Sequence, residues 1–195
     1  MGFQIEDGTG AGYLAKVSTE NRLYADSIIR TEREEQAISG EAYLIGSGFV
    51  TLTSANASAV LYFQNDNDFS LVITRYLVAV RASTGGTTNH VQGIIYKNPT
   101  GISGGSGSPV LAPNVNFGSS NTLTLTSEIG AEAATLTSGT AFASVVAPVE
   151  TLTTETAATI VPKGSSLGVL IVPPAGNTSI QVSVGINTHR LPNGN

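Results

Sequence analysis

The chain has 195 residues, of which 41% are hydrophobic and only 12% are charged, and its net charge is −5. With no cluster of Lys and Arg to release counterions, we do not expect nucleic acid as a partner, and the absence of cysteine excludes disulfides, thiol nucleophiles and thiolate metal sites. No apolar run approaches the ~20 residues that a membrane-spanning helix needs, and residues 1–7 show no secretion signal, so neither a membrane nor secretion is expected.

The N-terminal part differs from the rest of the chain in charge. About half of all charged side chains lie within residues 1–41, and they include both signs. Such a step in composition commonly separates a solvated or partner-bound segment from a compact body. We therefore predict a boundary near Gly40, with an N-terminal arm over residues 1–40 and a body over residues 41–195.

Two extended elements and a short helix are predicted within the arm. Residues 13–17 and 22–28 alternate apolar with polar side chains around a turn at 18–21, which favours a hairpin or an extended arm. An ordinary first hairpin of the body is the alternative. Thr31 followed three residues later by a glutamate fits a capping box, so a short helix is expected over residues 31–37.

The body is predicted to be all-β, because apolar residues recur at period two and almost none at the helical period of 3.6. Roughly eight to ten short, regularly spaced strands are typical of a β-sandwich or jelly roll. The fold class is therefore an all-β sandwich or jelly roll with an extended N-terminal arm. The predicted strands cover residues 42–45, 49–53, 57–64, 69–82, 91–97, 122–126, 141–148, 158–161, 167–172 and 178–191.

The connections between these strands are of two kinds. Gln64–Asp68 separates two β-prone runs, and since Asn and Asp tolerate left-handed backbone conformations, this segment is predicted to close a β-hairpin. Residues 83–89 and 98–121 are too long for tight hairpins. The second of these loops contains apolar anchors that a free linker would not need, so we expect it to be ordered against a neighbour. A linker between two subdomains is the alternative. The anchors are Val110, Leu111, Val115 and Phe117.

No group of residues adds up to an active site. The Gly-rich run at residues 7–12 precedes a predicted strand and lacks the Gly-Lys-Ser/Thr of a phosphate-binding loop. Ser103–Pro109, with His90 or His189 as a base, superficially suggests a nucleophilic serine, yet neither a nucleophile elbow nor an Asp partner can be identified. We therefore expect neither an enzyme nor a cofactor, and ordinary polar loops explain these segments.

The carboxylates do not define a metal site either. Asp66 and Asp68 alternate as oxygen ligands do in calcium loops, but the Gly and Glu that complete an EF-hand are missing. A cation shared between subunits, with Glu128 and Glu132 as further ligands, is the alternative. The two histidines have no matched third ligand for zinc. We assign no metal.

The opening of the chain resembles an N-terminal motif of tailed-bacteriophage virion proteins, of the form DGTGxGxxAKVxxxNRL. The stretches SAVLYFQNDNDFSLVIT, FGSSNTLT and PKGSSLGVLIVPPAGNTS are similar to the same type of protein, so the resemblance touches both ends and the middle of the chain. It implies a small β-sandwich that decorates or cements a capsid, often as a trimer. The matching motif residues are Asp7, Gly8, Thr9, Gly10, Gly12, Ala15, Lys16, Val17, Asn21, Arg22 and Leu23.

The resemblance implies a capsid decoration protein on the virion, assembled in the bacterial host cytoplasm as a homo-oligomer, with the major capsid protein as its partner. In this interpretation the arm makes the contact: glycines permit close backbone approach, apolar residues anchor it, and basic residues set its register. A receptor- or carbohydrate-binding module of a head fibre or tail is the alternative, disfavoured by the lack of Trp. The contact residues are Gly8, Gly10, Gly12, Tyr13, Leu14, Lys16, Val17, Arg22, Leu23, Tyr24, Arg30 and Arg33.

Overall fold

The computed structural model describes residues 31–85 and 90–191. Contacts along the chain define two compact units, residues 1–31 and 32–195, and the second of these is described here. The hairpin or arm predicted over residues 13–28 therefore lies outside the described residues. Within the described residues no helix has the length and apolarity to cross a membrane.

The second unit is built of antiparallel strands, which confirms the all-β prediction, and its helix α1 (Glu32–Ile38) begins directly after Thr31, as the capping pattern predicted. Most strands lie within a few residues of their predicted positions. The strands are β1 (Ala42–Leu52), β2 (Ser58–Asn65), β3 (Leu71–Thr84), β4 (His90–Lys97), β5 (Gly101–Ser103), β6 (Leu125–Ile129), β7 (Thr135–Thr137), β8 (Thr140–Pro148), β9 (Leu152–Val161), β10 (Ser166–Val172) and β11 (Ser179–Arg190).

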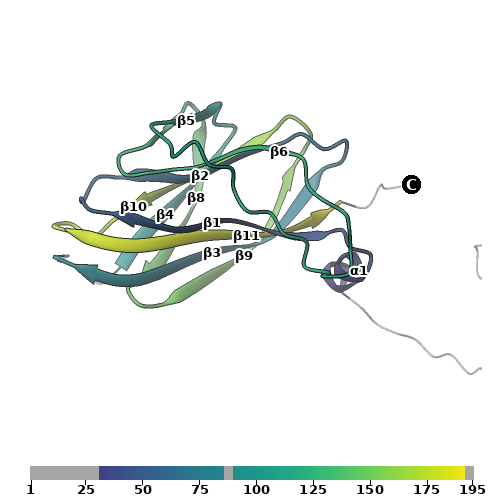
Figure 1. Cartoon of the computed structure of the whole chain (residues 1–195), viewed down its shortest axis with the longest axis horizontal. Coiled ribbons are helices and arrows are strands. Elements are labelled where there is room, and N and C mark those ends of the chain that lie inside the picture. The colour runs from purple at the N-terminus through teal and green to yellow at the C-terminus, as the bar shows by residue number, and fades with distance from the viewer. Residues whose placement is uncertain (1–30, 86–89, 192–195) are drawn as a thin grey trace, which may run out of the picture. The chain divides into compact units, whose positions relative to one another are not determined.

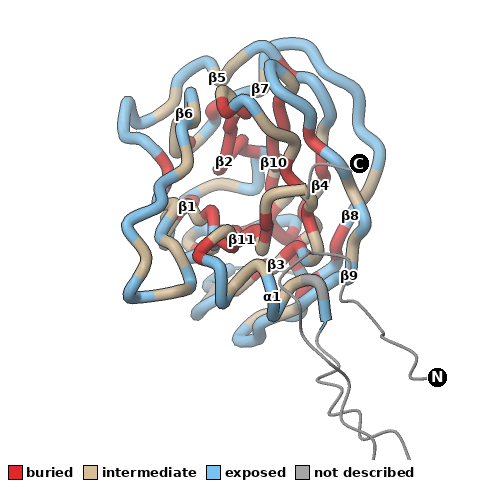
Figure 2. The backbone as a smooth tube through the Cα atoms, turned by 90° about the vertical axis from the view of Figure 1, so that its right-hand side faces the viewer, coloured by how far each residue is buried: buried red, intermediate tan, exposed pale blue. Residues whose placement is uncertain are grey.

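Two sheets form the sandwich, with strand orders β1-β11-β3-β9 and β6-β2-β10-β4-β8, and the short strands β5 and β7 pair separately (Figures 1 and 2). The pairings are nested: β1 with β11, β2 with β10, β3 with β9 and β4 with β8. The chain is thus a long antiparallel ribbon rolled into two sheets, which is the topology of a jelly roll. The residues between β4 and β8 form an insertion at the closed end of this ribbon.

The core lies between the two sheets, where the strands bury alternate side chains. Figure 2 shows the buried positions concentrated on the facing sides of the layers. The largest fully buried side chains are aliphatic or aromatic, which is what a close-packed sandwich core requires. They include Ile45, Leu61, Phe63, Ile73, Ile171 and Ile186.

The segment Gln64–Asp68 is not the predicted hairpin, because β2 and β3 belong to different sheets. The connection crosses between the sheets and is held by the fully buried Asn65. Its Nδ2 donates to the carbonyls of Phe69 (2.8 Å) and Val161 (2.9 Å), and its Oδ1 accepts from the backbone N (3.1 Å) and Nδ2 (2.8 Å) of Asn67. Asn65 therefore forms an Asx-turn with Asn67 and at the same time braces the two layers through its amide.

The two strands predicted over residues 42–45 and 49–53 are one strand, β1, interrupted by a bulge between Gly46 and Phe49. Gly48 lies in this bulge with a φ of 66°, a left-handed conformation that favours glycine. The bulge lets one strand bend along the edge of the sandwich where two shorter strands were expected.

Candidate interaction surfaces

Most of the residues predicted to contact a capsid lie within residues 1–30 and so outside the described residues. Arg33 is the exception: it lies in α1 and is partly buried. The contact role of the arm therefore stays a prediction. The described residues do show how the chain is anchored where it enters the sandwich.

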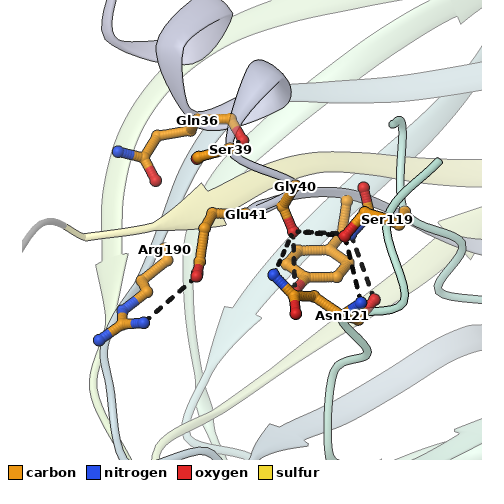
Figure 3. A network of polar contacts seen from close by, with 9 residues as sticks. Gln36, Ser39, Gly40, Glu41, Ser119, Asn121 and Arg190 are labelled. Carbon is orange, nitrogen blue, oxygen red and sulfur yellow. Dashed lines mark hydrogen bonds and ion pairs between the residues drawn. The ribbon is translucent and has the colours of Figure 1, made fainter. Parts of the chain in front are cut away.

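The carbonyl oxygen of Gly40 is the centre of this anchor (Figure 3). It accepts hydrogen bonds from Nδ2 of Asn114 (2.7 Å) and Nδ2 of Asn121 (3.2 Å), and the hydroxyls of Ser119 and Tyr43 lie at 3.5 Å. Gly40 has a φ of 74°, and a Cβ at this position would overlap the Ser119 side chain. The end of α1 is thus tied to a distant loop through a glycine that no other residue replaces without strain.

Glu41 and Arg190 join the same region to the last strand. The Arg190 Nη1 lies 3.3 Å from the Glu41 Oε1, and the Arg190 backbone N donates to the Glu41 carbonyl at 2.9 Å. The guanidinium also lies 4.8 Å from the centre of the Phe69 ring, a cation–π contact. Burial, followed by the nearby Glu41 carboxylate, raises the pKa of Tyr43, while Arg190 partly opposes that rise. The start of β1 and the end of β11 are therefore held together by charge as well as by strand pairing.

The long insertion loop is ordered against β1, as expected, but its backbone makes most of the contact. Leu111 and Gly46 exchange two backbone hydrogen bonds (2.7 and 2.9 Å), and Val115 N donates to the carbonyl of Ala42 at 3.0 Å. In Figure 1 this segment runs along β1 to α1 and then returns to β6. Of the four predicted anchors only Val110 is buried, so the prediction was wrong for the side chains of Leu111, Val115 and Phe117, which are exposed.

Residues 110–118 carry an inverted alternation of side chains. Val110, Ala112, Asn114 and Asn116 are buried or partly buried, and the residues between them are exposed. The two asparagines make hydrogen bonds instead of facing water. The four exposed positions of residues 110–117 are apolar, the reverse of an ordinary surface segment. We call them the apolar row: Leu111, Pro113, Val115 and Phe117.

The four outer edges of the two sheets are not equally covered within the described residues. The apolar-row segment lies along β1, and at β6 the Ser106 N donates to the Ile129 carbonyl (2.9 Å) while Ile129 N donates to the Ser108 carbonyl (2.7 Å). By contrast, β8 pairs only with β4 and β9 only with β3. These two strands lie on the side of the sandwich opposite β1 (Figure 2). One side is therefore covered, and the other presents bare strand edges.

A groove separates β8 from β9. It contains two hollows, of about 410 Å³ and 260 Å³, which share Phe142 and Thr159 in their walls. β8 has no charged residue, and β9 has only Glu155. Proteins usually protect edge strands with charges, Pro or bulges. A bulge occurs at Phe142 in β8, but Ala143–Pro148 pairs regularly and stays available. Phe142 and Ile160, which line the larger hollow, are exposed, and so are Val146 of β8 and Leu152 of β9.

Tyr76 provides an unsatisfied polar atom at the floor of the groove. This residue is 4% exposed, and its hydroxyl, which lies near Thr159, completes no hydrogen bond of normal geometry. Burial raises its pKa, so the hydroxyl stays protonated and remains a donor. The hydroxyl is sealed from solvent beside Thr159, so it belongs to the packed floor of the groove and is not open to a ligand.

The side chains considered above as a nucleophile or as cation ligands make hydrogen bonds that hold loops in place. The Ser106 hydroxyl donates to the Ile129 carbonyl at 2.8 Å, which ties its loop to the backbone of β6. Glu132 accepts hydrogen bonds from Thr53 N and the Ser54 hydroxyl, and Glu128 accepts one from Gly107 N (3.1 Å). Among the described residues no three His, Asp or Glu side chains gather as metal ligands would.

The carboxylates of the connection between β2 and β3 are used in the same way. Asp66 accepts hydrogen bonds from the Thr126 hydroxyl (2.7 Å) and the Gln64 amide (2.9 Å), and these bonds lower its pKa. Asp68 forms an exposed ion pair with Lys163, whose hydrogen bond and charge lower the pKa of Asp68. These aspartates stabilise the crossing between the sheets.

No protein-family model and no curated protein matches this chain. Among solved structures, T=1 particles derived from infectious bursal virus are similar over 78% of this chain, with 14% identity, a TM-score of 0.18 and coverage of 40% of the other chain. The T13 particle of IBDV is similar over 78%, with 15% identity, a TM-score of 0.17 and coverage of 39%. The chain thus spans about two fifths of the length of these viral particle proteins. At such TM-scores the likeness supports no functional argument.

Proposed function

We propose that this chain is a structural protein of a tailed-bacteriophage virion, namely a capsid decoration protein that forms a homo-oligomer and bridges coat subunits. The N-terminal DGTGxG motif supports the phage assignment. The observation that carries the proposal is the placement of exposed apolar side chains on two opposite sides of a sandwich that is poor in charge. Charge depletion and exposed apolar patches mark protein–protein interfaces.

The fold by itself does not choose the function, because jelly rolls occur in both viral capsid and lectin domains. The polar groups are more informative. Ser106, Glu128 and Glu132 are engaged with backbone groups of neighbouring loops, so they hold the framework rather than aim at a substrate. A rigid framework with apolar sides suits a protein that acts by binding its neighbours.

The N-terminal arm is the proposed contact with the coat. An arm that holds a neighbouring protein must be fixed where it joins the body. The hydrogen bonds to the Gly40 carbonyl and the Glu41–Arg190 ion pair fix the chain at that point. Each exposed ion pair of the arm would contribute only ~0–1 kcal/mol. Several arms in one oligomer would bind together, however, and multivalency multiplies a weak individual affinity.

Deletion of residues 1–30 tests this role. We expect the truncated protein to lose co-sedimentation with expanded capsids, prepared without the protein from the phage that encodes it. It should still form an oligomer that melts cooperatively. The matched control is full-length protein with Gln181→Lys, an exposed change on β11 that should bind as wild type does.

Capsid binding by the truncated protein would refute the arm assignment. Binding to a glycan array that survives the deletion, without any binding to capsids, would instead support the carbohydrate-binding alternative. A virion reconstruction provides an independent measurement, because hundreds of regularly spaced copies on the shell are expected of a decoration protein.

A further inference from the structure

We propose that the groove between β8 and β9 receives the apolar row of a second copy of this chain. The inference rests on the proposed assembling role and specifies the contact between subunits. The groove and the row lie on opposite sides of the same sandwich, at β8–β9 and at β1 respectively. Contacts between two different patches of identical subunits are heterologous, and they close into rings when the rotation between subunits permits.

The apolar row is pre-organised for insertion. Phe117 is fully exposed at the tip of the segment, yet the backbone on both sides of it is braced. The Asn114 Oδ1 accepts from Asn116 N (2.9 Å), the Asn116 Oδ1 accepts from Gly118 N (3.0 Å), and the Asn116 Nδ2 donates to the Ile38 carbonyl (3.0 Å). Binding therefore loses little conformational entropy at this segment, which favours affinity.

The groove provides an apolar pocket for the exposed side chains of such a segment. Its larger hollow, about 410 Å³ in volume, is walled by Phe142, Ile160 and Leu167 and can take an aromatic ring. The smaller hollow, about 260 Å³ in volume, continues the groove along Ala143–Val145 of β8. Aromatic anchors that fill desolvated pockets commonly dominate the energy of an interface.

Backbone pairing is available on both sides of the contact. Leu111, Pro113 and Val115 use their backbone groups toward β1, so the groups of Ala112 and Asn114 face away from it. The regular part of β8, Ala143–Pro148, has a strand neighbour on one side only among the described residues. An extended segment can add to such an edge through main-chain hydrogen bonds.

Electrostatics also permits this pairing. The apolar row has no charged residue, β8 has none, and Glu155 is the only one in β9. No like charges are brought together when the two surfaces meet. Pairing β9 with β9 would instead bring two Glu155 side chains into one interface, which disfavours a symmetric contact through that strand.

Sedimentation velocity of the full-length protein, without capsids, tests the contact. We expect Phe117→Ser and Phe142→Ser each to raise the dissociation constant of the oligomer at least about 10-fold, because Phe142 lines both hollows of the groove. Both side chains are exposed, so neither change should disturb folding, which circular dichroism verifies. Gln181→Lys is the matched control and should leave the oligomer intact. A monomeric wild type, or an oligomer unaffected by either variant, would overturn the proposal.

Cysteine cross-linking identifies the partner surfaces, and the chain has no cysteine of its own to interfere. Phe117→Cys protein mixed with Ser144→Cys protein should form a disulfide-linked species, whereas neither variant should do so alone. Homodimers of Ser144→Cys would show symmetric β8 pairing and contradict the heterologous contact. These assays contain no capsid, so their failure is distinguishable from a failure of capsid binding.

Discussion

Replacing Asn65 with alanine is expected to lower the free energy of unfolding by at least about 3 kcal/mol. The Asn65 side chain takes part in four hydrogen bonds while fully buried between the layers. Its loss leaves the buried Val161 carbonyl without this donor, at ~1–3 kcal/mol. It also removes a donor from the partly buried Phe69 carbonyl and two bonds that order Asn67, each worth ~0.5–1.5 kcal/mol. The sum is large because the braces join strands of both sheets.

The assay is urea unfolding followed by fluorescence and circular dichroism at one fixed protein concentration, since an oligomer's stability depends on concentration. For a domain of this size, a loss of ~3 kcal/mol corresponds to a fall in Tm of roughly 6–12 °C. Asn56→Ala, at an exposed loop position, is the control and should change stability by less than about 0.5 kcal/mol. If the two variants were equally stable, the role of Asn65 as a brace between the layers would be wrong.

Two further changes probe the same framework. Gly130→Ala would place a Cβ on the Ala59 carbonyl oxygen, a backbone atom that no rotamer change can move, so we expect a loss of at least about 3 kcal/mol in urea unfolding. Gly118→Ala meets only an ordinary contact and serves as its control; equal losses for the two would contradict the steric argument. Asp66 has its pKa lowered from 3.8 by hydrogen bonds from Thr126 and Gln64, so its stabilisation is complete above that value and lost as the pH falls through its folded pKa. The stability difference between wild type and Asp66→Asn should therefore shrink between pH 6 and pH 3, and a constant difference would show that this carboxylate is not responsible.

The strands that the sequence predicted well are those with a local signal. β3 and β10 are long apolar or alternating runs bounded by turn residues, and both lie within about two residues of their predicted positions. The helix α1 was recognised from Thr31 and its capping pattern. β5 and β7 were missed because three-residue strands exist only through their pairing with each other.

The connection Gln64–Asp68 shows why the pairing partners of the strands could not be predicted from local sequence signals. Asn and Asp suit a tight hairpin and a crossing between sheets equally well. Only the nested pairing of the rolled ribbon assigns β2 and β3 to different sheets, and only then do Asn65 and Asn67 find carbonyls to bind.

The interaction surfaces also combine properties that the sequence predicted with properties that only the tertiary structure decided. The period-two pattern of apolar residues predicted an all-β chain, and composition gave a chain without cysteine and poor in charge, because these properties do not depend on which residues meet. The tertiary structure decided which side chains of residues 110–118 point into the sandwich and which point outward. The carbonyl of Gly40 needs donors, and Asn114 supplies one by turning inward, which leaves Val115 and Phe117 facing outward. The backbone pairing of this segment with β1 and the inward hydrogen bonds of Asn114 and Asn116 together set the orientation, and neither can be seen in the local sequence.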